Sequence, residues 1–353
     1  MNNTTADIVI IGAGLSGLCL AYFLRRENLN IRLIEGRSRI GGRIQTHRTE
    51  NAPIEMGATW LSTGHTELQK LIRELDLEVF EQELGQTAIY EPMANSPHQV
   101  VALPVHQEPS FRIKGGTFLL IDSLMNKLSD THLELNCIVN HIEQKKEGLL
   151  VNTSNGTFMG KTVVSTLPPF LFQKTIQVSP ALPVSLIDIA KKTHTWMGES
   201  IKIGLSYRSP FWREKGLSGT IFSNPGPIPE MYDHSNEENT KFALKGFLNA
   251  AYFTLSREER LELILRQLEK YYGNQVKDYL DYSEMIWQNE PLTFSPYKDH
   301  IFPHQHNGNK AFREIYLNNN LFISGSETAE AFPGYMEGAV RSAQAVFRKI
   351  IQG

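Results

Sequence analysis

The chain has 353 residues, which is too long for a single hydrophobic core, so we expect two packed lobes. Hydrophobic residues make up 41% and charged residues 21%, which is typical of a soluble globular protein. The formal net charge of −3, from 35 basic and 38 acidic residues, excludes a strongly basic field that would attract nucleic acid or an anionic membrane.

Cysteine usage and the N-terminus bear on the compartment. Two cysteines, Cys19 and Cys137, make no disulfide framework, which indicates a reducing compartment. The uncharged stretch from Ile8 to Leu24 is short for a membrane span and follows Asp7, where a signal peptide carries basic residues. We therefore expect a cytoplasmic protein without a membrane partner.

The N-terminal half opens with a β-α-β unit. A buried strand over Asp7–Ile11, a helix over Gly17–Arg26 and a strand over Ile31–Glu35 predict the start of a parallel sheet. Ala88–Pro109 indicates a connection or a strand with loops. The remaining expected elements here are helices over Thr66–Leu75 and Phe118–Leu128, and strands over Leu133–Val139, Gly148–Thr153 and Thr162–Thr166. We place a crossing between lobes at Pro168-Pro169.

In the C-terminal half, Ile201–Tyr207 alternates between apolar and polar residues. This predicts a half-buried strand with Lys202, Gly204 and Ser206 on its polar face. Ser256 and Glu259 have capping-box spacing and open a helix that ends near Tyr272. Further strands are expected over Thr220–Ser223, Phe242–Leu248 and Leu321–Ser324, and a last helix over Met336–Ile351.

The turn between the first strand and helix carries the first chemical motif. Gly12-Ala13-Gly14-Leu15-Ser16-Gly17 is a GxGxxG sequence. Its first glycine permits a tight turn, the second lets backbone approach a pyrophosphate, and the third lets helix pack on strand. The helix N-terminus attracts phosphate. Glu35 ends the next strand, where a carboxylate accepts hydrogen bonds from ribose hydroxyls. Together these features predict a dinucleotide site.

The segment after Glu35 distinguishes the dinucleotide. It has the pattern E-x-R-x-R-x-G-G-R-x-x-T, formed by Glu35, Arg37, Arg39, Gly41, Gly42, Arg43 and Thr46. The paired glycines admit close backbone approach, and Arg43 can neutralise pyrophosphate charge. This arrangement resembles the FAD-binding flavin amine oxidase superfamily, which includes monoamine, polyamine and amino-acid oxidases.

The resemblance extends along the chain and implies a cofactor site. Glu55–Trp60 is similar to the segment that passes beside the isoalloxazine ring, and Lys114-Gly115-Gly116 to the return into the FAD lobe. Gly325–Ala329 resembles the family's G-[TS]-E-T, whose glutamate, here Glu327, contacts the ribityl and pyrophosphate region. Gly334–Val340 resembles the start of the last helix, which faces the flavin pyrimidine. The implied cofactor-binding residues are Gly12, Gly14, Ser16, Gly17, Glu35, Arg37, Gly42, Arg43, Gly57, Ala58, Thr59, Trp60, Val139, Trp287, Gly325, Glu327, Tyr335 and Met336.

The resemblance also implies three catalytic residues. Lys202, followed by Pro210-Phe211-Trp212, is similar to the family lysine that holds a water near flavin N5. Tyr297 and Tyr335 match the two rings of the aromatic cage that orients an amine. In covalent members a cysteine precedes the first cage tyrosine, but here that position is Pro296, so we expect non-covalent FAD. His300, His304 and His306 cluster, but Pro303 interrupts them and we interpret them as a surface loop without metal.

The expected fold is α/β, with a discontinuous Rossmann-like FAD-binding domain (1–75, 109–168 and 285–353) and a smaller α+β substrate domain on a mixed sheet (76–108 and 169–284). The implied activity is oxidation of an amine to an imine by hydride-equivalent transfer to FAD, with O₂ reduced to H₂O₂. Two alternatives stay open: a desaturase or porphyrinogen-type oxidase, and a flavin-binding partner protein without turnover. Only 53 residues lie between Trp60 and Lys114, where many relatives carry a longer insertion. We therefore expect an open site or one completed by a bulky substrate or a second copy of the chain.

Overall fold

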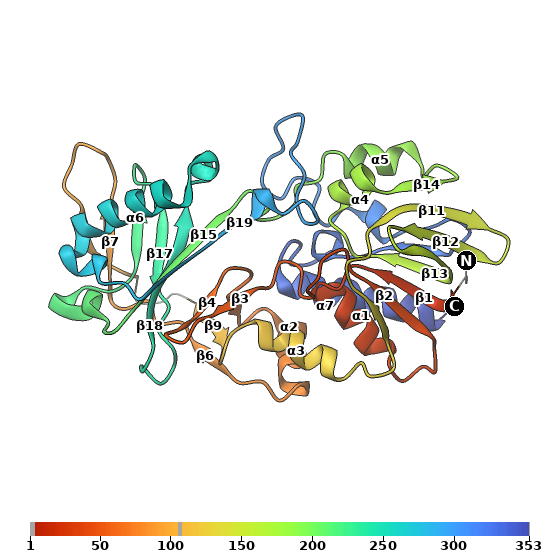
Figure 1. Ribbon diagram of the computed structural model, residues 1–353, viewed down its shortest axis with the longest axis horizontal. Helices are drawn as coiled ribbons and strands as arrows, with labels where there is room; N and C mark the ends of the chain where they lie inside the picture. Colours follow the sequence, from red (N-terminus) through yellow and green to blue (C-terminus); the bar gives the residue numbers. More distant parts are fainter. Residues whose placement is uncertain (1–3, 105–107, 353) are drawn as a thin grey trace.

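The computed structural model describes residues 4–104 and 108–352, which form two lobes side by side (Figure 1). The expected α/β fold with a Rossmann-like half is confirmed. The larger lobe contains a nine-stranded sheet in the order β10-β2-β1-β13-β12-β11-β14, with β21 beside β13 and β20 beside β21. Its strands are β1 (Thr4–Ile11), β2 (Ile31–Ile34), β10 (His132–Glu134), β11 (Val139–Lys145), β12 (Gly148–Thr153), β13 (Gly156–Ser165), β14 (Gln177–Ser179), β20 (Ile315–Tyr316) and β21 (Leu321–Ile323).

Both faces of this sheet are covered, because its central strands are apolar on both sides. Ile8 and Ile10 of β1 pack into one core, whereas Val9 and Ile11 pack into the other. The first core lies under helices α1 (Leu15–Leu24), α2 (Thr66–Glu74), α3 (Phe118–Asn126) and α7 (Met336–Gln352); the second lies under α4 (Pro169–Thr175) and α5 (Val184–Ala190). The parallel order places the carboxyl end of β1 and the N-terminus of α1 at the same edge.

The second lobe is built on a seven-stranded sheet in the order β19-β15-β18-β17-β16-β7-β8. Its strands are β7 (Thr87–Glu91), β8 (Gln99–Ala102), β15 (Ile201–Tyr207), β16 (Ile221–Ser223), β17 (Glu230–Asp233), β18 (Phe242–Leu248) and β19 (Asp281–Ile286). Helix α6 (Arg257–Tyr272) covers one face through Ile264 and Leu268. The predicted capping box of Ser256 and Glu259 is present.

Two small sheets lie between these large ones. β3 (Thr46–Arg48) pairs with β4 (Pro53–Glu55), and β9 (Ser110–Ile113) pairs with both β5 (Leu61–Ser62) and β6 (Val79–Glu81). Ile54 of β4 packs against the other face of the seven-stranded sheet, where Ala243 belongs to the same small core. The face of β15 that carries Lys202 is therefore covered by protein.

Four expectations differ from this fold. The crossing between lobes does not fall at Pro168-Pro169, because β14 pairs with β11 and the core under α4 and α5 belongs to the nine-stranded sheet. The region 88–109 contains the hairpin β7–β8. The strand expected over Leu133–Val139 is two strands, separated by a turn at Asn136 with φ of 53°. β15 is buried at all seven residues rather than half-buried.

Candidate active site

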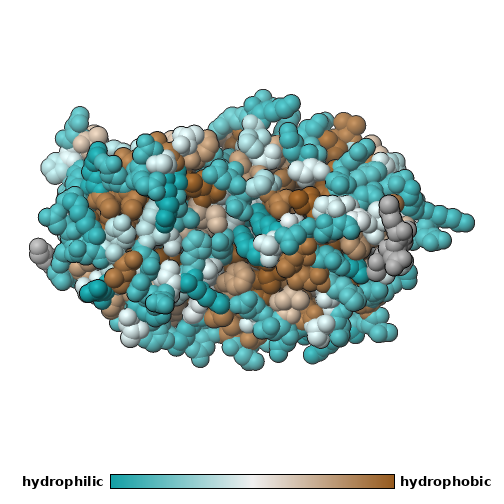
Figure 2. All heavy atoms as spheres, viewed as in Figure 1, coloured by the Kyte–Doolittle hydropathy of each residue, from teal (hydrophilic) through white to brown (hydrophobic). Residues whose placement is uncertain are grey.

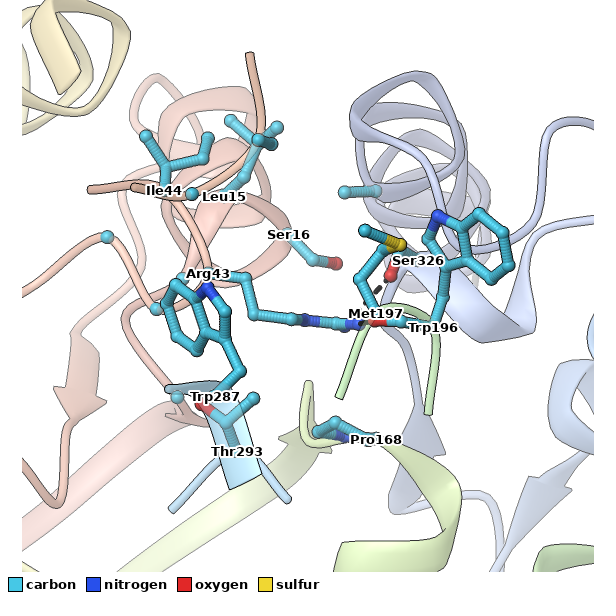
Figure 3. A pocket seen from close by; sticks show the side chains of 18 of the residues that line it. Leu15, Ser16, Arg43, Ile44, Pro168, Trp196, Met197, Trp287, Thr293 and Ser326 are labelled. Atoms are coloured by element: carbon cyan, nitrogen blue, oxygen red, sulfur yellow. Dashed lines mark hydrogen bonds between the residues drawn. The ribbon is translucent and has the colours of Figure 1, made fainter. Parts of the chain in front are cut away.

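A cavity of about 1040 Å³ lies where the two lobes meet, and both contribute to its wall (Figure 3). The nine-stranded lobe contributes the glycine-rich turn and the end of β2, and the seven-stranded lobe contributes Lys202 and Phe247 from neighbouring strands. All the residues predicted for the site lie on this wall except Gly17, Glu327 and Tyr297. Motifs from Gly12 to Met336 thus converge on one cavity.

The glycine-rich turn presents backbone donors to the cavity. Gly14 and Ser16 lie on the wall, and no side chain among the described residues caps the N-terminus of α1. Gly17 has the packing role expected of the third glycine, since a Cβ atom there would lie 2.0 Å from the carbonyl oxygen of Gly12. The free N–H groups and the positive end of the helix make this turn a site for an anion such as pyrophosphate.

Glu35 is held in position by backbone donors from two loops. Its carboxylate accepts hydrogen bonds from the N–H of Ala13 and of Arg37, both at 2.9 Å. Glu35 is buried but still lies on the cavity wall. Each carboxylate oxygen has a second lone pair, so the group can also accept from the hydroxyls of a ribose. Val139 lines the same end of the cavity.

Arg43 reaches across the cavity, as Figure 3 shows, from the side of Trp287 toward Ser326. Its guanidinium makes a bidentate pair with Glu327, at 2.5 and 2.9 Å, and donates to the Ser326 hydroxyl at 3.0 Å. Burial opposes both charges, but each group holds the other ionised: the pKa of Arg43 is raised and that of Glu327 is lowered. Glu327 is fully buried and does not line the cavity, so its contact with the cofactor stays a prediction, and in this structure its carboxylate positions Arg43.

Arg37 is anchored in a similar way. Its guanidinium donates to Glu290 at 3.0 Å and to the Thr293 hydroxyl at 2.7 Å, and it lines the cavity. Glu290 and Thr293 belong to the segment that follows β19, so this contact joins a distant part of the chain to the dinucleotide half. Sequence spacing gave no sign of this pair.

The opposite end of the cavity is formed by Gly57, Ala58, Thr59 and Trp60 together with Lys202. The ammonium of Lys202 donates to the carbonyl oxygen of Gly57. Burial lowers the pKa of Lys202 to about 8, although Glu55 opposes that shift. The indole of Trp287 is buried and donates to the carbonyl oxygen of Met56 at 2.9 Å. This end therefore places one cationic side chain beside an otherwise fixed backbone segment.

Tyr297, the first tyrosine predicted for the aromatic cage, makes its contacts away from the cavity. Its hydroxyl accepts a hydrogen bond from the backbone N–H of Thr195 at 2.8 Å, and its ring packs edge-on against Phe170 and Phe294. The ring lies outside the cavity wall. The tertiary packing of Tyr297 makes it a support for the loop before β15.

Trp196, which sequence reasoning missed, faces Tyr335 on the wall. Their ring centroids lie 5.7 Å apart with an interplanar angle of 44°. The rings of His304 and Trp196 are stacked, with their centroids 3.7 Å apart. The backbone N–H of Trp196 donates to Glu327. Gly334 has φ of 91°, and a Cβ atom there would lie 2.8 Å from Cβ of Trp196. The glycine before Tyr335 therefore makes room for this tryptophan.

The mouth of the cavity is apolar and accessible. Tyr335 is 41% exposed and Phe332 is 37% exposed, and both line the cavity with His65. In the face shown in Figure 2, apolar patches near the middle interrupt a mostly hydrophilic surface. The rings of Tyr335 and Phe332 therefore keep part of their surface exposed at the entrance, and whether the short 61–113 region leaves the site open stays a prediction.

The histidines at 300, 304 and 306 do not form a metal site in the described residues. Across 4–104 and 108–352, no group of three or more His, Cys, Asp and Glu side chains could hold a metal ion. His304 instead contributes to the aromatic stack behind Trp196. Its pKa is lowered by burial and by the neighbouring His194.

The wall fits FAD. A carboxylate able to accept from ribose, an uncapped helix N-terminus and an arginine lie at one end, and the end at Gly57–Trp60 carries one lysine. Glu35, Arg43 and the turn at Gly14 would hold the dinucleotide, and Gly57–Trp60 with Met336 would hold the flavin. Cys137 lies on the wall beside Val139 and Cys19 is buried in α1, so neither thiol lies near Lys202 and Trp287.

Comparisons with known proteins agree with this site. The family model described as "Flavin containing amine oxidoreductase" matches residues 15–92 and 93–351. The chain is 24% identical over 453 aligned residues to "Probable flavin-containing monoamine oxidase A" of Dictyostelium discoideum, covering 99% of this chain and 98% of that protein. It is 23% identical over 454 residues to "Amine oxidase [flavin-containing] B" of Homo sapiens, covering 98% and 86%.

Solved structures show the same fold. Putrescine oxidase, wild type bound to putrescine, superposes with a TM-score of 0.86 at 23% identity over 100% of both chains. Cyclohexylamine oxidase from Brevibacterium oxydans IH-35A superposes with a TM-score of 0.85 at 19% identity, over 99% of this chain and 100% of that chain. At these identities the structural likeness establishes the architecture alone.

Proposed function

This chain belongs to the family of flavin containing amine oxidoreductases, and on that premise we propose that it oxidises a small neutral amine packed against the rings of Trp196 and Tyr335, with O₂ as the electron acceptor. The observation that carries the proposal is the buried Lys202 beside Gly57–Trp60 on the wall of an FAD-sized cavity. Bound FAD, held by Glu35, Arg43 and Gly57–Trp60, would supply the redox chemistry of a two-electron oxidation of the amine, with O₂ reduced to H₂O₂.

The protein's own part is to bind, orient and set the electrostatics. Trp196 and Tyr335 contribute apolar ring surface to the cavity wall, so an amine packed against them loses water, which favours its neutral, reactive form. The cationic form of Lys202 can hold a water or stabilise negative charge that develops as O₂ is reduced. Because the amine reacts in its neutral form, the reaction requires no general base from the described residues.

Lys202 also separates the proposal from a desaturase or porphyrinogen-type oxidase. Those relatives share the dinucleotide motifs but generally lack this lysine and the paired cage tyrosines. Here the lysine is present, and an aromatic pair is formed by Trp196 and Tyr335 rather than by two tyrosines. These residues favour amine chemistry over the alternatives.

An anaerobic titration of the purified yellow protein tests the proposal. We expect small amines to bleach the flavin and, after air is admitted, to yield stoichiometric H₂O₂. Bleaching only by large polyenes or porphyrinogens would support the second enzyme class, and no bleaching by any of these would support a non-catalytic flavoprotein.

The attachment of the cofactor is tested on the same sample. Pro296 offers no nucleophile, and both cysteines lie away from Lys202 and Trp287. Precipitation with acid should therefore release all of the yellow colour into the supernatant. Colour retained in the pellet would contradict non-covalent binding.

A further inference from the structure

A second lysine, Lys245, lies directly behind the cavity wall. It is fully buried, with 0% of its surface exposed. It stands on β18, where Phe247 pairs with Lys202 of β15 and Lys245 pairs with Gly204. Lys245 and Lys202 are therefore diagonal neighbours on one face of the sheet, close enough for long side chains to meet. Neither the motifs nor the comparisons assign a role to Lys245.

The contacts of Lys245 connect it to the flavin-facing segment. Its Nζ donates to the Thr59 hydroxyl at 2.9 Å and lies 3.8 Å from the centroid of the Trp60 ring. The Nζ atoms of Lys245 and Lys202 each lie 5.2 Å from the centroid of the Phe247 ring. Thr59, Trp60 and Lys202 line the cavity, whereas Lys245 does not. Lys245 thus touches the wall from behind at two adjacent residues.

Few negative charges lie near the ammonium groups of these two lysines. Glu55 of β4 is buried, and its carboxylate already accepts from the Thr117 N–H at 2.6 Å and the Thr46 hydroxyl at 2.9 Å. Glu230 of β17 adds attraction to both lysines. Arg112 of β9 adds a further positive charge.

The remaining facing group, His234, adds no further positive charge. Burial lowers its pKa well below the usual value, and Arg112 and both lysines lower it further, so its ring is neutral. Burial, and next the charge of Lys202, lower the pKa of Lys245 well below its usual range. A hydrogen bond to Lys245 raises the pKa of Lys202. Burial and mutual repulsion therefore disfavour a second positive charge on the pair, and the strong lowering at Lys245 favours charge on Lys202.

We propose that Lys245 is a positioning residue for amine oxidation: its neutral amine accepts a hydrogen bond from the Lys202 ammonium and donates one to Thr59, which fixes the Lys202 charge at the cavity wall. This inference deepens the proposed function and rests on it. The arrangement explains how one side chain of a buried lysine pair stays cationic without a carboxylate in direct contact.

The first test uses the flavin-free protein and needs no turnover. A neutral folded Lys245 and a charged unfolded one differ by one bound proton, so the free energy of unfolding rises with pH in the wild type below the unfolded pKa. In Lys245→Met that contribution is lost, and the slope between pH 6 and 8 should fall by about one proton. Urea unfolding across this range measures it. Exposed Lys241, at the start of the same region, supplies the control Lys241→Met, which should keep the wild-type slope.

The second test measures the rate of flavin reoxidation by O₂ as a function of pH, because that rate depends on the charge of Lys202. Lys245→Met removes the amine that accepts the hydrogen bond from Lys202, so the fall in rate at high pH should move to lower pH. Lys245→Gln, whose amide can donate and accept, should keep that fall near its wild-type pH and covers the case in which the methionine variant does not fold. A shift to higher pH in Lys245→Met would mean that both lysines are charged and would overturn the proposal, as would an unchanged unfolding slope.

The two tests also separate this inference from the proposed function. If no amine reduces the flavin, the proposed function fails, while the unfolding slope still reports whether Lys245 is neutral. If amines are oxidised but Lys245→Met and Lys245→Gln have the same pH profile of reoxidation, Lys245 has no positioning role.

Discussion

The two ends of the cavity treat buried charge in opposite ways. At the dinucleotide end, each charged group on the wall has a partner: Arg43 with Glu327, Arg37 with Glu290, and Glu35 with two backbone N–H groups. At the other end, Lys202 and Lys245 lie together, and burial depresses the pKa of both.

The difference follows from what each end must do. A cofactor that stays bound needs a rigid, already satisfied frame, which lowers the entropy cost of holding it. A cation that stabilises negative charge formed during the reaction should have no carboxylate partner in the resting protein. A fixed but unpaired charge stabilises the transition state more than a charge that is already paired. The paired end should therefore control stability and affinity, and the lysine end should control rates.

The largest expected effect comes from breaking a pair at the dinucleotide end. Glu327→Gln leaves the Arg43 charge without its carboxylate in a mostly buried site, at a cost of about 3 kcal/mol of unfolding free energy. Thermal and urea unfolding of the flavin-free protein would measure this. Glu330→Gln, at an exposed glutamate three residues away, is the matched control and should change little. Equal stability of the two variants would contradict the role given to Glu327.

At the lysine end the expected effect is on rate. Lys202→Met should slow reoxidation of the flavin by O₂ about a hundredfold, since one preorganised donor to developing negative charge typically contributes that much. Reduction by amine should change far less, which makes it the internal control. Stopped-flow measurement of both half-reactions gives the two rates. Equal slowing of both would indicate general damage to the site and remove the distinction between the two ends.

The dinucleotide end could be predicted from sequence because its geometry is local. One β-α-β unit positions both the turn Gly12–Gly17 and Glu35. Gly12, Gly14 and Glu35 line the cavity, and Gly17 packs against the strand, as predicted. The role of Glu327 could not be predicted, because the partner that takes its carboxylate, Arg43, lies 284 residues away in sequence.

The lysine end was predicted only in part. The alternation of Ile201–Tyr207 identified the strand, but not that Ile54 covers its second face; a Cβ atom on Gly204 would lie 2.4 Å from Cγ2 of Ile54. Tyr297 has the expected spacing from Trp287, yet its hydroxyl bonds to Thr195 instead. Trp196 belongs to no motif, and the contacts that place it against Tyr335 include the close approach of Gly334 and the hydrogen bond from its N–H to Glu327.

At the dinucleotide end, Glu35→Ala should weaken FAD binding by about ten- to a hundredfold. The change removes a charged acceptor worth about 1.5–3 kcal/mol. It also frees the N–H groups of Ala13 and Arg37, so part of the loss comes from the turn itself. Fluorescence titration of the flavin-free protein with FAD would measure the dissociation constant. Glu27→Ala, at an exposed glutamate of the same unit, should bind as the wild type does; an unchanged affinity in Glu35→Ala would mean that its carboxylate makes no cofactor contact.

The smallest expected effect decides which ring belongs to the amine end. Trp196 lines the cavity and faces Tyr335, whereas Tyr297 is packed behind it against Phe170 and Phe294. An aromatic pair contributes about 0.5–1.5 kcal/mol beyond burial, so Trp196→Leu should raise KM for a small amine by about two- to tenfold with little change in kcat. Tyr297→Leu should instead lower the melting temperature, because it removes the acceptor of the Thr195 N–H, and leave KM nearly constant. Steady-state kinetics and thermal unfolding on both variants make the comparison. If Tyr297→Leu raises KM and Trp196→Leu does not, the amine is held by the two tyrosines of the family pattern, and the ring of Tyr297 must turn into the cavity when FAD binds.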